Sequence, residues 1–315
     1  MMDSFVRNKP SLLVIAGPTG VGKTAVAVAL AARVPIEVVS ADSRQVYRGM
    51  DAATGKPSAE ERRAVVHHLI DVADPDDRYQ AARFRTEALR ALVDIRARGR
   101  LPVVVGGTGL YIRALLRGLD PAPPADPVFR AELETVGAHA LHERLVAAAP
   151  AMARRLHPHD RVRVVRALEL VRAGSALGDE QVRWRGGELE HDALYIGLTM
   201  SREILAERLR ARARAMAASG LAAEVQSLLD RGYEASQPAL RGIGYAQFID
   251  VVRGRLDPEE AVRLMERDTV RYARRQWTWF AREPGIRWID VLEAGGTAMV
   301  AARVETMLRQ GGVIE

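Results

Sequence analysis

The residues best suited to chemistry lie near the amino terminus, where positions 17–24 read GPTGVGKT. Two glycines separated by four residues, then a lysine and a hydroxyl residue, form the pattern of a phosphate-binding loop. Backbone N–H groups of such a loop converge on phosphate oxygens, Lys23 adds a compact positive charge, and the Thr24 hydroxyl ligates Mg²⁺. The pattern therefore predicts phosphate binding, and leaves open whether ATP, GTP or a simple diphosphate ester is bound. The predicted contacts are Gly17, Pro18, Thr19, Gly20, Val21, Gly22, Lys23 and Thr24.

Lysine itself is a signal in this chain, because only three of its 46 basic residues are lysines and the rest are arginines. A chain that almost always uses arginine has a compact ammonium group at position 23.

Two further polar residues follow apolar runs that predict buried strands. Asp42 comes shortly after 36–40 (IEVVS), and Thr108 follows 101–105 (LPVVV) through two glycines. In a doubly wound sheet the ends of these strands face the ligand crevice. Asp42 fits a general base, a magnesium contact or a helix cap, and Thr108 fits either a crevice residue or the cap of its own helix.

The order of elements predicts an α/β fold. Apolar runs at 11–16, 36–40 and 101–105 alternate with helical patterns at 24–33 and 81–98. Strands that alternate with helices form a parallel sheet with helices on both faces. We therefore expect a phosphate-loop parallel sheet.

The alternation stops at 119–127 (LDPAPPADP), where the prolines exclude a strand. Positions 128–173 show only helical patterns, and strand signals return at 194–199. We expect an all-helical insertion over 121–192, and a catalytic core made of 1–120 together with 193–315. Long helices are predicted at 202–231 and 258–282, and a late strand at 286–291.

His67 and His68 precede a possible strand at 69–75 (LIDVADP). Adjacent side chains of a strand point to opposite faces, so a metal shared by the two rings is not expected. We interpret both histidines as structural.

Composition limits the possible functions. The chain has no cysteine, which excludes disulfides, cysteine-based zinc sites and thiol nucleophiles. No apolar run approaches the roughly 20 residues of a membrane span, so we expect a cytoplasmic protein without a membrane segment. A net charge of +6 suggests a polyanionic partner. Arginines gather at 154–172 and, among Trp277, Trp279 and Phe280, at 263–287, which fits either RNA contacts or solvated helices over buried tryptophans.

Together these motifs resemble the tRNA dimethylallyltransferases, also called tRNA isopentenyltransferases, of the bacterial type. The matching blocks run in the family's order from residue 12 to about 280: GPTGVGKT, VVSADSRQVYRGMDAATGKP, HHLIDVADP, VVVGGTGLYIRALLRG, RLHPHD with RALE, GIGYAQ and YARRQWTWF. The resemblance implies transfer of a dimethylallyl group from dimethylallyl diphosphate to the exocyclic amine of the adenosine 3′ to the anticodon. Pyrophosphate would leave and no ATP would be consumed.

The resemblance also implies roles for single residues. Asp42 matches the base that acts on the adenine amine, and Thr108 matches its partner near the reacting diphosphate. The glycine loop would hold the diphosphate, with Arg212 and Arg275 as cationic groups around it and Mg²⁺ on Thr24. The residues implied to contact the tRNA anticodon stem-loop are Asp42, Ser43, Arg44, Gln45, Thr108, Arg130, Val162, Arg163, Val164, Val165, Arg166, Arg241, Gly242, Ile243, Gly244, Tyr245 and Ala246.

Two positions depart from the family pattern. Ala246 stands where arginine is common, so that RNA contact is missing, and His159 stands where asparagine is frequent. Two other functions share the phosphate loop: a nucleoside or small-molecule kinase, and an RNA-stimulated NTPase switch. A kinase would consume ATP, and the Asn-Lys-x-Asp signature of GTPases does not occur in the sequence. We expect a monomer.

Overall fold

The computed structural model describes residues 11–119, 123, 126–174 and 192–314. They belong to two compact units, Met1–Leu116 with Leu189–Glu315, and Arg117–Glu188. The two units meet at 116/117 and at 188/189. The boundaries expected from the sequence, at 120/121 and 192/193, each lie four residues after these positions.

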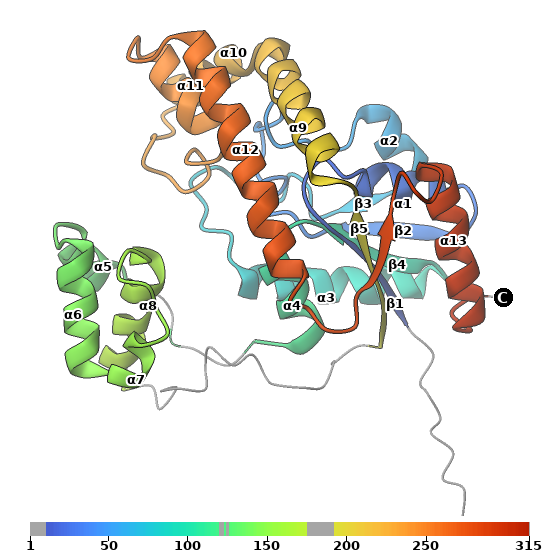
Figure 1. Cartoon of the computed structure of the whole chain (residues 1–315), viewed down its shortest axis with the longest axis horizontal. Helices are drawn as coiled ribbons and strands as arrows, with labels where there is room; N and C mark the ends of the chain where they lie inside the picture. Colours follow the sequence, from blue (N-terminus) through green and yellow to red (C-terminus); the bar gives the residue numbers. More distant parts are fainter. Residues whose placement is uncertain (1–10, 120–122, 124–125, 175–191, 315) are drawn as a thin grey trace, which may run out of the picture. The chain divides into compact units, whose positions relative to one another are not determined.

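The larger unit is built on a six-stranded parallel sheet (Figure 1), which confirms the predicted fold class. The strand order is β3-β2-β4-β1-β5-β6. The strands are β1 (Leu12–Ala16), β2 (Ile36–Ser40), β3 (His67–His68), β4 (Leu101–Gly106), β5 (Ala193–Thr199) and β6 (Arg287–Asp290).

Helices cover both faces of this sheet, because alternate side chains of its strands are buried on opposite sides. From β1, Leu12 and Val14 pack in one apolar cluster with α3 (Ala81–Ala97) and α4 (Gly109–Arg117). Leu13 and Ile15 pack in a second cluster with α1 (Lys23–Ala31) and α13 (Thr297–Gln310). The sheet is thus buried on both sides, as its continuous apolar strands require.

The remaining helices of this unit are α2 (Ala59–Ala64), α9 (Arg202–Met216), α10 (Ala222–Asp230), α11 (Tyr245–Val252) and α12 (Pro258–Phe280). Helix α12 begins at Pro258, and the Asp257 side chain caps it by accepting from the N–H groups of Glu259 and Glu260. It packs along α9.

Two predicted elements are wrong in their bounds. The single helix expected over 202–231 is interrupted by a π-helical turn at Ala217–Leu221, because Gly220 takes a left-handed backbone (φ 96°). The strand expected over 69–75 does not form; the two histidines before it are the strand. Leu69 (φ 61°) and Asp71 (φ 58°) turn the chain away directly after them.

The smaller unit is all-helical over its described residues. It contains α5 (Pro127–Glu134), α6 (Ala138–Ala148), α7 (Pro150–Ala153) and α8 (Arg161–Arg172). Its own apolar core includes Leu133, Leu141, Leu145 and Val164. Asp160 caps α8 by accepting from the N–H of Arg163.

Candidate active site

Three loops that carry predicted site residues meet at one edge of the sheet. The phosphate loop follows β1, Asp42 follows β2 and Thr108 follows β4, and these strands are neighbours in the order β2-β4-β1. Because the strands are parallel, their carboxyl ends lie side by side. The fold therefore brings together residues that are more than 80 positions apart in sequence.

The phosphate loop has the backbone that its glycines permit. Gly17 (φ 145°), Gly20 (φ 79°) and Gly22 (φ 103°) all have positive φ, and Gly22 precedes the first turn of α1. A Cβ on Gly17 would lie 2.5 Å from the carbonyl oxygen of Leu198, so a side chain there would collide with backbone. The Lys23 ammonium donates to the carbonyl oxygens of Gly17 (3.0 Å) and Pro18 (2.8 Å) and so bridges its own loop.

Gln276 on α12 connects this loop to the loop that carries Thr108. Its side-chain oxygen accepts from the N–H of Thr19 (2.8 Å), and its amide nitrogen donates to the carbonyl oxygen of Gly107 (2.8 Å). Gln276 is buried, so both polar ends of its side chain are used inside the protein. The sequence places Gln276 in the YARRQWTWF block but gives no sign of this role.

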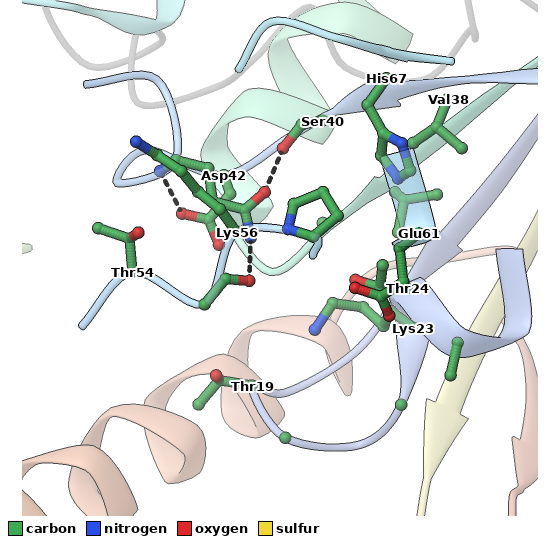
Figure 2. Close-up of a pocket in the computed structure, with 18 of the residues that line it drawn as sticks. Thr19, Lys23, Thr24, Val38, Ser40, Asp42, Thr54, Lys56, Glu61 and His67 are labelled. Carbon is green, nitrogen blue, oxygen red and sulfur yellow. Dashed lines mark hydrogen bonds between the residues drawn. The ribbon is translucent and has the colours of Figure 1, made fainter. Parts of the chain in front are cut away.

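A pocket opens over the phosphate loop, the loop that follows β2 and the end of β4, and Thr108 is not among the residues that line it. Figure 2 shows Lys23 and Thr24 on one side of it, Ser40 and Asp42 on the other, and Glu61 and His67 at one end. The pocket is lined by Thr19, Gly20, Gly22, Lys23, Thr24, Ala25, Val38, Ser40, Asp42, Gln45, Thr54, Gly55, Lys56, Pro57, Glu61, His67, Val105, Gly106, Arg208 and Arg212.

The loops of Asp42 and Thr108 are joined by hydrogen bonds. The Thr108 hydroxyl oxygen accepts from the N–H of Ser43 (3.0 Å), and the N–H of Thr108 donates to the carbonyl oxygen of Ala41 (3.1 Å). Asp42 Oδ1 accepts from the N–H groups of Arg44 (2.8 Å) and Gln45 (3.4 Å). Asp42 therefore caps its own turn and also lines the pocket. A capping role does not exclude a role toward a ligand in the pocket.

Charge in the pocket is unbalanced toward cations. Burial lowers the pKa of Lys23 to about 8, although the nearby Asp42 charge opposes the shift. Burial also lowers the pKa of Arg212, again against Asp42. Gly55 leaves room for Arg212, since a Cβ there would lie 1.9 Å from its Nη2 atom. Desolvated cations around a glycine loop favour an anionic ligand.

Lys56 lines the same pocket but is committed to the protein. Its ammonium donates to Asp51 Oδ1 (2.6 Å), Asp71 Oδ1 (2.5 Å) and the carbonyl oxygen of Tyr47 (2.7 Å), and its side chain is buried. Lys56 therefore ties the segment that contains Tyr47 and Asp51 to Asp71. The rarity of lysine is the signal that would have singled it out.

The other predicted residues of the larger unit are dispersed. Gln45 lines the pocket and bonds Ser40 and Gly55, whereas Arg44 donates to the carbonyl oxygen of Pro238 (2.9 Å). Arg275 is exposed and does not line the pocket; its guanidinium lies over the Tyr272 ring.

The GIGY segment is partly a structural element. Arg241 is exposed and Ile243 and Ala246 are half-buried, while Gly242, Gly244 and Tyr245 are buried. Gly244 takes a left-handed backbone (φ 93°), and the Tyr245 hydroxyl donates to Glu224.

The arginines predicted on the smaller unit differ in their surroundings. Arg130 and Arg166 both bond the carboxylate of Glu169, at 2.6 Å and 3.0 Å, and the Glu169 side chain is only 2% exposed. Burial raises the pKa of Glu169, but hydrogen bonds from these arginines outweigh that effect and hold it below its usual value. Sequence reasoning missed Glu169, although RALE is one of the matching blocks.

Helix α8, which carries Arg166 and Glu169, also carries the remaining predicted residues of the smaller unit. Val162 is 81% exposed and the Arg163 side chain is 67% exposed. Val165 is half-buried, and Val164 is fully buried in the core of the unit. The Val164 side chain therefore packs inside the unit, and the tRNA contact implied for this position stays a prediction.

The tryptophans of α12 fit the structural alternative. The Arg202 guanidinium covers the Trp277 ring at 4.2 Å and that of Arg113 covers Trp279 at 4.3 Å, while Phe280 is buried. One face of each tryptophan ring is therefore covered by a protein cation.

No helix among the described residues is long and apolar enough to cross a membrane. Nor does the described part of the chain hold a cluster of three or more histidine, aspartate or glutamate residues suited to a metal ion.

Comparisons with known proteins agree with the fold and the motifs. The family models described as IPP transferase and isopentenyl transferase match residues 45–283 and 10–79. A tRNA dimethylallyltransferase from Syntrophotalea carbinolica is 50% identical over 90% of this chain and 91% of its own, and one from Geobacter sulfurreducens is 46% identical over 92% and 94%.

Solved structures give the same result. A tRNA isopentenylpyrophosphate transferase from Bacillus halodurans superposes with a TM-score of 0.70 at 36% identity, covering 96% of this chain and 97% of its own. A eukaryotic dimethylallyltransferase described as acting on tRNA gives a TM-score of 0.76 at 29% identity, covering 89% and 73%. The resemblance seen in the sequence is confirmed, and with it the prenyltransferase interpretation over the kinase and the NTPase: the chain belongs to the tRNA dimethylallyltransferase family.

Proposed function

We propose that this chain transfers a dimethylallyl group from dimethylallyl diphosphate to the exocyclic amine of the adenosine 3′ to the anticodon of a tRNA. The observation that supports the proposal most is the meeting of three strand ends. They place the phosphate loop and Asp42 around one cationic pocket and hydrogen-bond Thr108 to the Asp42 loop, in a member of a prenyltransferase family.

The phosphate loop would hold the diphosphate. When the allylic carbon–oxygen bond breaks, negative charge grows on the leaving pyrophosphate and positive charge on the allyl carbon. Loop N–H groups, Lys23 and Arg212 are donors that interact more strongly as this charge develops. Lys23 must exchange the carbonyl oxygens of Gly17 and Pro18 for phosphate oxygens.

Asp42 would act as the base. The adenine nitrogen bonds to the allyl carbon as pyrophosphate leaves, and the proton that this nitrogen sheds passes to the carboxylate. The hydrogen bonds at Oδ1 hold the carboxylate in place, and Thr108 anchors the neighbouring N–H of Ser43. Asp42 is thus oriented by the turn that it caps.

The residues present also fit a magnesium ion. The Thr24 hydroxyl opens the helix that follows the loop and lines the pocket beside Lys23, which is the chemistry of a phosphate-loop Mg²⁺ site. When bound, the ion would neutralise part of the diphosphate charge.

The smaller unit would contact the anticodon stem-loop through the exposed part of α8. Arg163 is its most accessible predicted cation, and Val162 lies beside it. Arg130 and Arg166 would contribute chiefly by fixing this surface. We also propose a monomer, and a tRNA substrate supports a cytoplasmic location.

Incubation with dimethylallyl diphosphate, Mg²⁺ and an anticodon stem-loop, followed by mass measurement of the RNA, tests the proposal. We expect a five-carbon addition without ATP. Addition that requires ATP, or phosphorylation in its place, would favour the kinase.

A further inference from the structure

The two adjacent histidines of β3 have unequal surroundings. Strand β3 pairs with β2 in the register Val38 with His67 and Val39 with His68, so the two rings lie on opposite faces. His68 Nε2 lies 2.7 Å from Oε2 of Glu37, which Arg98 also bonds. His67 Nε2 is buried and has no hydrogen-bond partner among the described residues. A structural role thus accounts for His68 and for Nδ1 of His67, but not for Nε2 of His67.

The other ring nitrogen of His67 fixes what Nε2 can do. Nδ1 lies 2.8 Å from the carbonyl oxygen of Val65, and a carbonyl oxygen only accepts, so Nδ1 carries the hydrogen. Burial lowers the pKa of His67, which favours the neutral ring. In the neutral ring with hydrogen on Nδ1, Nε2 presents a lone pair and needs a hydrogen-bond donor.

His67 lines the end of the pocket that also contains Glu61, near Val38 (Figure 2). Buried acceptors without a partner are rare in native proteins, and each asks for an explanation such as a ligand. A bare diphosphate offers chiefly acceptor oxygens, which suit Lys23 and Arg212 but not Nε2. Mg²⁺ keeps several water molecules when it binds phosphates, and metal-bound water donates hydrogen bonds.

We propose that His67 Nε2 accepts a hydrogen bond from a water molecule of the Mg²⁺ that enters the pocket with the diphosphate. His67 is then a binding residue for the hydrated metal, and Thr24 supplies the direct ligand. The proposal rests on the placement of the diphosphate under Proposed function. It gives the unpaired nitrogen of β3 a hydrogen-bond donor.

Calorimetric binding of pyrophosphate to the full chain, with Mg²⁺ and with EDTA, tests this assignment without relying on turnover. His67→Phe keeps a ring of similar shape and removes the acceptor. We expect it to weaken binding of Mg²⁺-pyrophosphate about fivefold, the effect of one hydrogen bond, and to leave metal-free binding unchanged. His67→Gln offers a carbonyl oxygen and should restore part of the affinity, including where the Phe variant folds poorly.

His68→Phe is the matched control, because it removes a histidine whose partner is already in the protein. It should lower the thermal midpoint and leave Mg²⁺-pyrophosphate affinity unchanged. Unchanged Mg²⁺-pyrophosphate affinity in both His67 variants would overturn the proposal, as would an equal loss with and without Mg²⁺. If the wild-type chain binds no pyrophosphate, the placement of the diphosphate fails first and this proposal fails with it.

Discussion

Apart from Lys56, which bonds two carboxylates, the cations that line the pocket have surroundings opposite to those of Arg130 and Arg166 in the helical unit. In the pocket, Arg208 and Arg212 have no carboxylate within ion-pair distance in the part of the chain that the structure describes, and Lys23 bonds only carbonyl oxygens. In the helical unit, Arg130 and Arg166 converge on the buried carboxylate of Glu169. Burial lowers the pKa of Lys23, whereas the hydrogen bond between Arg130 and Glu169 raises the pKa of Arg130.

The difference separates binding from structure. A cation without an anionic partner is an unfavourable arrangement that an anionic ligand relieves, so the pocket is prepared for a diphosphate. A cation that already bonds a buried carboxylate neutralises that charge within the fold, and fewer of its hydrogen-bond donors remain for a phosphate of a ligand. The same residue type therefore predicts different effects of substitution in the two regions.

Asp42→Asn should produce the largest effect. Asparagine keeps an oxygen for the N–H groups of Arg44 and Gln45, so the turn should hold, but it cannot accept the proton. We expect single-turnover transfer to slow by about 10³-fold, within the range for loss of a general base. Pyrophosphate affinity should change by less than about twofold in the same preparation. An equal loss of affinity would mean that Asp42 holds the ligand.

Lys23→Ala removes the central unpaired cation. We expect pyrophosphate affinity to fall by about 100-fold, since a desolvated charge-assisted contact is lost, as measured by calorimetry. The thermal midpoint of the free protein should not fall, because the lysine is desolvated there and bonds only carbonyl oxygens. A fall in stability with unchanged affinity would place Lys23 with the structural cations.

The sequence predicts the fold and the phosphate loop well, for a physical reason. Strand–glycine–helix patterns are local, and parallel strands then bring positions 17–24, 42 and 108 to one edge whatever the details of packing. The motif blocks identify the family, and the structure accounts for why Asp42, Gln45 and Arg212 share a pocket.

Contacts made by distant residues could not be predicted in the same way. Gln276 bridges Thr19 and Gly107, and Glu169 joins Arg130 to Arg166, through side chains that meet only in the folded chain. The break at Gly220 was missed because the apolar spacing continues through it. Local patterns do not record which partner a polar side chain finds.

Glu169→Ala tests the structural half of the comparison. Removing the carboxylate leaves Arg130 and Arg166 partly buried without their partner, and we expect a loss of about 2 kcal/mol from the helical unit, reduced from fully buried pairs by solvent screening. Hydrogen exchange localised to α8 measures it. Glu132→Ala is the control: its partner Arg172 lies 3.5 Å away in an exposed pair, and it should cost less than about 0.5 kcal/mol.

The pH dependence of pyrophosphate binding sharpens the description of the pocket. The pKa of Lys23 is about 8, so the ammonium that binds the anion is present below that pH and is lost above it. Affinity of the free protein should fall by up to about tenfold per pH unit above 8. Lys23→Arg stays charged and should show no such fall, which separates the lysine from the ionisation of pyrophosphate itself.

Arg163→Glu should give the smallest effect, because one exposed cation shares RNA binding with others. We expect the affinity for an anticodon stem-loop to fall about fivefold at moderate salt, with the slope of log K against log salt reduced by about one. The reversal leaves the Glu169 cluster intact, so the fold should be unaffected. Arg144→Glu, on an exposed position of α6, carries the same change of charge and lies outside the predicted contacts. An equal loss in both variants would mean that overall charge, not α8, determines RNA affinity.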